Sequence, residues 1–195
     1  MTKSEETIIK KVFEISGKNA SLALSKTLHL DLDKYEVWFG ETAAAPQENG
    51  CEKAFVTFLD FDGAVAGKII IALPEKDTVK IVNEKLLQNM GGADLNLTMS
   101  AVSEIANIIV GAFFSTLSDF CKVNVLESTP KTDIKNWQEL GSIARDQETM
   151  TLAITLKTHP EYIGYFILSM KESASKTLVD ILKINRWKEL SKTAG

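Results

Sequence analysis

The 195-residue chain is 45% hydrophobic and 25% charged, and its formal net charge is −4. This composition favours a folded domain with a sizeable core and argues against intrinsic disorder. The net negative charge, without a cluster of lysine and arginine, argues against a protein that binds nucleic acid.

The cysteines and the N-terminus bear on the cellular compartment. Cys51 and Cys121 are far apart and lack the CxxC spacing of zinc or redox sites. A reducing compartment therefore fits better than a disulfide framework. Residues 1–16 are charged and lack the apolar core of a signal peptide. No apolar run approaches the roughly 18–20 residues that span a bilayer, so we expect a cytoplasmic protein without a membrane segment.

The first half of the chain predicts a helix, three strands and a second helix. Apolar residues in 4–28 follow helical spacing, and Thr2 and Glu5 have the spacing of a capping box. The other predicted elements are a strand at 29–39, a loop at 41–50, a hairpin of strands at 53–61 and 66–73 that turns at Asp62-Gly63, and a helix from Pro74 to Gly91-Gly92.

The second half predicts the same order again. Its predicted elements are a long helix at 98–120, a strand at 122–127, a short helix or structured loop at 133–145, strands at 149–157 and 162–170 with a turn at His159-Pro160, and a helix at 171–190. Pro130 ends the first of these strands.

This shared order indicates an internal repeat of about 95 residues. A shift of 93 residues sets ALSK at 23–26 over TLSD at 116–119. Because neither half alone buries much surface, we expect repeat one (about 3–92) and repeat two (about 96–190) to share one core in a single domain, 1–195. The expected fold class is α/β (α+β), a pseudo-twofold unit with a mostly antiparallel sheet of about six strands.

A polar stripe interrupts the long apolar helix predicted at 98–120. Ser100, Glu104 and Asn107 are spaced i, i+4 and i+7, which places them within about 60° of one another on a helix. A solvated face is the ordinary explanation of such a stripe. Asparagine is a poor choice for a solvated helix interior, because its side chain competes for backbone hydrogen bonds. Lysine and arginine are also absent from 86–121, which favours a docking surface.

The string SAVSEIANIIVG (100–111) resembles the signature of the CheC/CheX/FliY family of phosphatases in bacterial and archaeal chemotaxis. The family pattern is Ser or Asp, three residues, Glu, two residues and Asn, which Ser100, Glu104 and Asn107 match. The resemblance extends over most of the chain. Residues 91–107 are similar to the family's approach to this helix, and 66–82 to the strand, turn and helix that end its first repeat. The resemblance implies a CheC-like fold.

The resemblance also implies a protein-aspartyl-phosphate phosphatase, a hydrolase that acts on a CheY-type response regulator in chemotaxis or another two-component pathway. Glu104 and Asn107 would be its catalytic residues: Asn107 orders the attacking water, and Glu104 pairs with the regulator's lysine. Ser100 and Glu104 would bind the partner, although Ser100 is equally expected to cap the helix. The regulator would supply magnesium, and the chain would carry no cofactor or metal of its own. CheX-like relatives dimerise, which leaves a homodimer open.

The first helix keeps the scaffold without the motif. The 93-residue shift aligns Thr7, Lys11 and Glu14 with the three motif positions, so glutamate is replaced by lysine and asparagine by glutamate. One competent site is therefore expected, as in the single-site CheX pattern. Because this chain keeps the fold where the motif has gone, the alternative is a non-catalytic binding or scaffolding module that docks a regulator or another signalling protein.

Small residues near the motif have two explanations. Ala101, Ala106 and Gly111 serve either tight packing within the core or the close approach of another surface, and core packing is the slightly favoured explanation.

The remaining chemistry-bearing residues are better explained by structure than by function. His29 and His159 are 130 residues apart without a paired carboxylate motif, so neither a metal site nor a histidine-based nucleophile is expected. Trp187 is expected to pack in the core. Nothing near Cys51 predicts a reactive thiolate. Four aspartates, Asp31, Asp33, Asp60 and Asp62, are expected at hairpin ends rather than on magnesium.

Overall fold

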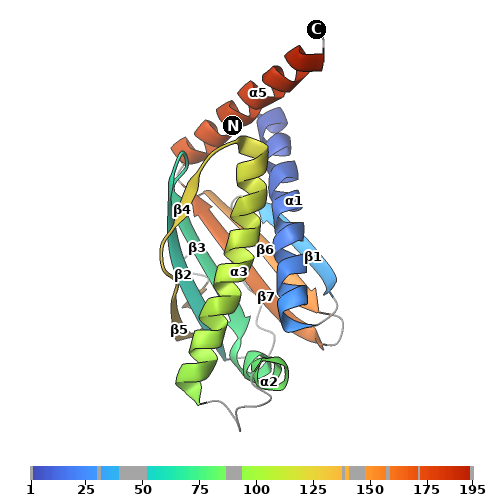
Figure 1. Ribbon diagram of the computed structural model, residues 1–195. Helices are drawn as coiled ribbons and strands as arrows, with labels where there is room; N and C mark the ends of the chain where they lie inside the picture. Colours follow the sequence, from blue (N-terminus) through green and yellow to red (C-terminus); the bar gives the residue numbers. More distant parts are fainter. Residues whose placement is uncertain are drawn as a thin grey trace.

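The fold combines helices with a single antiparallel sheet (Figure 1). The computed structural model describes residues 2–29, 32–39, 52–86, 94–137, 139–140, 148–156, 159–170 and 172–193. Its elements in chain order are α1 (Lys3–Leu28), β1 (Leu32–Phe39), β2 (Lys53–Gly63), β3 (Gly67–Pro74), α2 (Glu75–Lys85), α3 (Leu95–Cys121), β4 (Val125–Glu127), β5 (Lys131–Asn136), β6 (Glu148–Leu156), β7 (His159–Met170) and α5 (Glu172–Thr193). The predicted α/β (α+β) class is confirmed, whereas the division into repeats at 3–92 and 96–190 within one domain, 1–195, stays a prediction.

The sheet joins the two halves of the chain at its centre. In the described part of the chain it has seven strands in the order β1-β6-β7-β3-β2-β4, and β5 pairs with the same strand β2 as β4 does. Every pairing is antiparallel. β3 of the first half pairs with β7 of the second half, where Ile70 lies opposite Ile167. Side chains from both halves therefore contribute to one core.

The expectation of about six strands was one too low, because part of the segment predicted as a short helix or loop at 133–145 is a strand. Lys131–Asn136 forms β5 along β2, with Ile134 opposite Phe55. The pattern KTDIKN alternates directly after Pro130, so Thr132 and Ile134 share one face of the strand. Ile134 packs against the main core, and this burial holds the segment extended.

The predicted hairpin turn at Asp62-Gly63 was placed slightly early. Strand β2 continues through Gly63, and the turn follows it. Gly63 has φ +128°, a conformation that side chains rarely adopt, and a Cβ there would lie 2.5 Å from the carbonyl oxygen of Asn124. Glycine therefore ends β2 where β4 begins to pair with it.

Helices α1 and α3 lie side by side on one face of the sheet and run in opposite directions (Figure 1). Phe113 of α3 joins the layers, because its ring centroid lies 5.8 Å from that of Phe13 on α1 and 4.8 Å from that of Phe166 on β7. All three side chains are almost completely buried. The central helix α3 is thus fixed from two sides, and only a narrow outer face is left for another function.

The opposite face of the sheet has its own apolar cluster. Trp137 and Leu140, which follow β5, pack there with Ile70, Tyr165 and Ile167. The ring centroids of Trp137 and Tyr165 lie 5.7 Å apart. Because this cluster is buried, we expect exposed functional groups on the helical side of the sheet instead.

Helix α3 corrects the expectation that no apolar segment is long enough to span a membrane. By length and composition alone it is apolar enough to cross a membrane, with a mean hydropathy of 1.6 over its most apolar window. The same helix carries ten buried residues that pack against α1 and the sheet. One such helix is weak evidence of a membrane span, since the core helix of a folded domain passes the same test.

Candidate functional site

The three motif residues lie together on the outer face of α3. Ser100, Glu104 and Asn107 are all exposed, whereas Ile105 and Ala106 between them are buried. The three side chains of the predicted stripe therefore share one exposed face, because the helix turns its apolar side to the core and these side chains to solvent. The spacing of Glu104 and Asn107 brings their Cβ atoms to about 5–6 Å, near enough to act on one partner group.

No hydrogen bond or ion pair within the described residues engages the side chain of Ser100, Glu104 or Asn107. An exposed glutamate or asparagine on a helix commonly pairs with a neighbour three or four positions away. Here the carboxylate and the amide keep their full hydrogen-bonding capacity for another molecule. This is the main observation that separates the stripe from an ordinary surface network.

The capping role considered for Ser100 is wrong. Helix α3 begins earlier than predicted, at Leu95, and its N-cap is Asp94, whose side chain accepts a 2.8 Å hydrogen bond from the backbone N–H of Leu97. Ser100 lies in the second turn, where every backbone N–H already has a helical partner. Its hydroxyl is therefore free of a capping task.

A chain of hydroxyl groups attaches the motif helix to the sheet, and no pattern in the sequence predicts it. The Ser103 hydroxyl lies 2.6 Å from that of Thr132 on β5, and Thr132 lies 2.8 Å from the Thr57 hydroxyl on β2. Ser103 immediately precedes Glu104, so this chain sets the rotation of α3 about its own axis. Only the pairing of β5 with β2 brings these three residues together.

Removal of the central hydroxyl tests this attachment. We expect Thr132→Val to lower the free energy of unfolding by about 1–2 kcal/mol, because it breaks two hydrogen bonds and leaves the buried Thr57 hydroxyl without this partner. Denaturant unfolding should show a lower midpoint with an unchanged slope. Thr129→Val is the matched control at an exposed position, and a similar loss there would count against the hydroxyl chain.

Helix α1 reproduces the packing of α3 but not its outer face. The Asn19 amide donates a 2.9 Å hydrogen bond to the hydroxyl of Thr116 on α3, and Phe13 of α1 stacks on Phe113 of α3. Lys11 is exposed and Glu14 is half-buried. Helix α1 therefore carries a positive and a negative side chain at the positions where α3 has its carboxylate and its amide. Thr7 is exposed as well. The contrast between the helices lies in the surface side chains rather than in the scaffold.

The small residues near the motif divide between the two explanations. Ala106 is fully buried and Ala101 packs against the main core, so both serve internal packing. Gly111 is half-exposed, and a Cβ built on it meets no atom within 4 Å beyond its chain neighbours and the backbone of its own helix in the described structure. Core packing, which was the favoured explanation, is therefore wrong for Gly111.

Among the residues that the structure describes, the other candidates from the sequence do not form a second site. His29 is the left-handed C-cap of α1, with φ 51°. The Cys121 thiol is buried, and this burial raises its pKa to about 11, which makes it a poor nucleophile. Asp60 and Asp62 lie at the exposed end of β2. No cluster of three or more His, Cys, Asp or Glu suited to a metal occurs in the described ranges.

Several further candidates cannot be placed. Cys51 and Asp31 lie outside the described residues, and the side chains of Asp33, His159 and Trp187 are likewise not described. The backbone shows only that His159 begins β7 instead of occupying the predicted turn.

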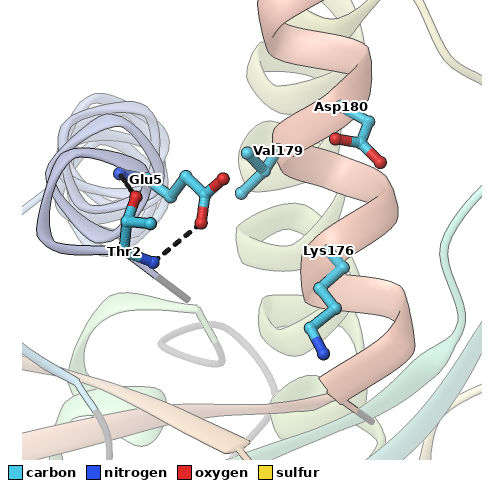
Figure 2. A pocket seen from close by; sticks show the side chains of 5 residues that line it. All are labelled: Thr2, Glu5, Lys176, Val179 and Asp180. Atoms are coloured by element: carbon cyan, nitrogen blue, oxygen red, sulfur yellow. Dashed lines mark hydrogen bonds between the residues drawn. The ribbon is translucent and has the colours of Figure 1, made fainter.

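A pocket of roughly 390 Å³ lies elsewhere, between the start of α1 and helix α5 (Figure 2). Thr2 and Glu5 line it from α1, and Lys176, Val179 and Asp180 line it from α5. Thr2 and Glu5 form the predicted capping box, with backbone-to-side-chain hydrogen bonds in both directions. A second Glu5 oxygen accepts a 2.7 Å hydrogen bond from Lys183. These contacts indicate that the pocket is structural, since it lies where the N-terminal cap of α1 is joined to the terminal helix α5.

The Glu5–Lys183 pair predicts a specific dependence of stability on pH. The hydrogen bond from Lys183, followed by that from the Thr2 backbone, lowers the pKa of Glu5 from 4.5 to about 2. A lowered carboxyl pKa stabilises the fold above the unfolded value and loses this contribution as the pH falls toward the folded value. We expect Glu5→Gln to reduce the melting temperature at pH 7, and the difference from wild type to shrink between about pH 4.5 and pH 2.

Lys183→Met is the matched control for this pair, because it removes the same contact from the other side. It should reproduce the pH profile of Glu5→Gln. A difference from wild type that stayed constant down to pH 2 would show that the ion pair is not the cause.

Comparison with known proteins bears on the motif helix and on the whole fold. A model of the CheC-like family matches residues 97–133, the segment from the first turn of α3 into β5. A search of curated proteins found no match. The family match therefore covers the motif and the strand to which Ser103 is bonded.

Solved structures share the fold over most of the chain at low sequence identity. FliY from Thermotoga maritima is 15% identical, with a TM-score of 0.65 over 94% of this chain and 98% of that one. CheX from Desulfovibrio desulfuricans is 14% identical, with a TM-score of 0.60 over 82% and 99%. A structure described as the CheX–CheY–BeF3–Mg2+ complex from Borrelia burgdorferi is 15% identical, with a TM-score of 0.58 over 82% and 98%.

The same arrangement of helices and sheet also occurs in a structure from H. pylori described as a FliM–SpeE complex. It is 10% identical, with a TM-score of 0.58 over 94% of this chain and 96% of that one. At these identities the likeness shows the fold alone. The CheC-like family model thus matches the motif helix, and the fold of the whole chain is similar to those of FliY and CheX.

Proposed function

We propose that this protein is a phosphatase that hydrolyses the aspartyl phosphate of a CheY-type response regulator. The observation that carries the proposal is the pair Glu104 and Asn107: both side chains are exposed, adjacent and without partners in the described structure, on a helix held by the core. The family match covers this pair, and one structure with this fold is a complex of CheX with CheY. That complex motivates the choice of partner.

The proposed chemistry needs only two functions from this chain. Hydrolysis of an acyl phosphate requires a water molecule in line with the phosphorus and opposite the leaving carboxylate. An amide has both a carbonyl acceptor and N–H donors, so Asn107 can fix the position and orientation of that water without removing a proton. The regulator's own magnesium would neutralise charge on the phosphoryl group, and no cofactor on this chain is proposed.

Glu104 would provide docking and register. Its carboxylate pairs with a lysine at the regulator's active site, in a charge-assisted hydrogen bond. No lysine or arginine occurs from 86 to 121, so the face of α3 holds no cation of its own that would compete for Glu104 or repel the regulator's lysine. With Glu104 paired, Asn107 is one helical turn away and can reach into the same opening.

The support of α3 suits this role, because an ordered water requires a backbone that does not shift. The helix is packed through Phe113 against α1 and β7 and tied through Ser103 to β5. Groups preorganised in this way act without reorganisation when the reaction occurs, which is a large part of their catalytic effect.

The direct test measures the decay of a phosphorylated CheY-type regulator in the presence of magnesium, with and without this protein. A panel of regulators from the same genome is needed, because a non-cognate regulator would not dock. We expect faster release of phosphate with at least one member of the panel. An unchanged decay rate with a regulator that demonstrably binds at saturating protein would rule out catalysis.

A second candidate is a binding or scaffolding module without catalysis. Two observations favour it: α1 keeps the scaffold without the motif, and the structure described as a FliM–SpeE complex has the same fold over 94% of this chain. Under this alternative, the regulator or another signalling protein would bind α3 without loss of phosphate. The decay experiment at saturating protein separates the two functions. Whether the protein forms a homodimer is to be tested by measuring its oligomeric state in solution.

A further inference from the structure

We propose that Gly111 is a positioning residue of the site on α3, where the absence of a side chain lets the phosphorylated regulator approach closely enough for Asn107 to act. The proposal rests on the proposed function and adds a residue to it. Gly111 follows Asn107 by four positions, so the two lie one turn apart on the same face of the helix.

The fold itself gives no reason for glycine at this position. A Cβ at Gly111 would have no neighbour within 4 Å in the described chain beyond its chain neighbours and the backbone of its own helix. At Gly67, by contrast, a Cβ would lie 2.3 Å from the carbonyl oxygen of Ser169 and 2.6 Å from the Phe61 ring. Gly67 is therefore required by packing, whereas Gly111 stands in open space.

Glycine in an exposed helix interior is normally a disadvantage. It destabilises the helix relative to alanine, because glycine loses more conformational freedom than alanine when the chain folds. At Gly111 no close contact and no left-handed backbone angle within this chain offsets that loss. An unfavourable residue without an internal reason points to a requirement outside the chain.

Helices α1 and α3 differ at this position, as the proposal requires. The 93-residue shift that aligns the motif positions sets Lys18 of α1 opposite Gly111 of α3. Lys18 is exposed, so its long side chain projects from the helix that lacks the motif. The open space therefore accompanies the glutamate and asparagine and is absent where they have been replaced.

The reach of asparagine explains why space is needed. Its amide oxygen and nitrogen lie three bonds from Cα, no farther than the methyl groups of leucine and less far than the ammonium group of lysine. To order a water against phosphorus, the amide and the water must come within about 3 Å of each other. A long side chain one turn away would contact the regulator first and hold its phosphoryl group beyond that reach.

The experiment compares Gly111→Ala, Gly111→Leu and the control Lys18→Leu, which places leucine at the corresponding position of α1. The melting temperature is measured first. Because alanine is the better helix former, Gly111→Ala should raise it by about 2–4 °C. A fall instead would show that the fold needs glycine there and would overturn the proposal.

The catalytic readout uses the cognate phosphorylated regulator with magnesium, and binding uses the same regulator with beryllofluoride. We expect Gly111→Leu to lower the maximal rate of dephosphorylation about tenfold or more, because a displacement of about 1 Å at a reacting group can lower a reaction rate by that factor or a larger one. The affinity for the beryllofluoride form should fall by a smaller factor, and Lys18→Leu should leave both values at wild type.

The outcomes distinguish this proposal from the function on which it rests. If wild type is active, Asn107→Ala is inactive and Gly111→Leu matches wild type, only the role of Gly111 is overturned. If wild type accelerates decay of no regulator that it binds, both proposals fail. Equal losses in Gly111→Leu and Lys18→Leu would attribute the effect to added surface leucine and also overturn the role of Gly111.

Discussion

Asn107→Ala should reduce the acceleration of dephosphorylation by about 100-fold or more while the regulator still binds within a few-fold of its wild-type affinity. The reason is that the amide acts on the attacking water, which is positioned only in the reaction, whereas docking depends on Glu104 and the surrounding surface. Asn107 is exposed and makes no hydrogen bond inside the described structure, so its truncation should leave the fold intact. Rate constants at saturating protein, with binding measured separately, check the result.

Two further variants make this experiment specific. Asn107→Asp keeps the shape of the side chain but removes its N–H donors and adds a negative charge close to the phosphoryl group, so it should be as impaired as alanine. Lys11→Ala combined with Glu14→Ala alters the corresponding positions on α1 and should leave the rate unchanged. Full activity in Asn107→Ala would place the chemistry elsewhere on the molecule.

The sequence was informative where periodicity and capping rules apply. The spacing of apolar residues located the two long helices, and the Thr2–Glu5 pair predicted the cap that begins α1. It also placed Ser100, Glu104 and Asn107 on one face, because the angle between positions on a helix is fixed by geometry. The fold class followed from the order of these local elements.

What could not be predicted depends on contacts between distant segments. β5 was missed because KTDIKN is polar and short, and only its pairing with β2 and the burial of Ile134 make it a strand. The hydroxyl chain through Thr132 depends on that same pairing. The exposure of Gly111 required knowledge of every neighbouring side chain, which no spacing rule supplies.

Ser100 illustrates a different limit. A serine near the start of an apolar helix is equally consistent with a cap or a contact, and the decision depended on one earlier residue. Asp94 accepts the capping hydrogen bond, so the helix begins three residues, just under one turn, before the start that the apolar pattern indicated. Local propensity thus identified the candidates, and tertiary structure selected between them.

Glu104→Lys should weaken binding of the regulator about 100-fold or more and lower the apparent second-order rate of dephosphorylation by a similar factor. Loss of one partner of a desolvated charge pair costs about 2 kcal/mol or more, which is about 30-fold in affinity, and the new lysine adds repulsion between like charges. The maximal rate at saturating protein should fall less than in Asn107→Ala, because the amide that orders the water remains. Titration of the beryllofluoride-activated regulator measures the affinity directly.

Ionic strength separates a charge pair from a change of shape. Glu104→Gln keeps the size of the side chain and removes only the charge, so it should bind more weakly than wild type at low salt and converge toward it as salt rises. Dissolved salt weakens the attraction between opposite charges, more during encounter in water than in a desolvated pair, whereas it leaves steric contacts unchanged. If Glu104→Gln and wild type showed parallel salt dependence, Glu104 would not face a cation on the partner, and register at the site would have to come from Ser100 and the surface around Gly111.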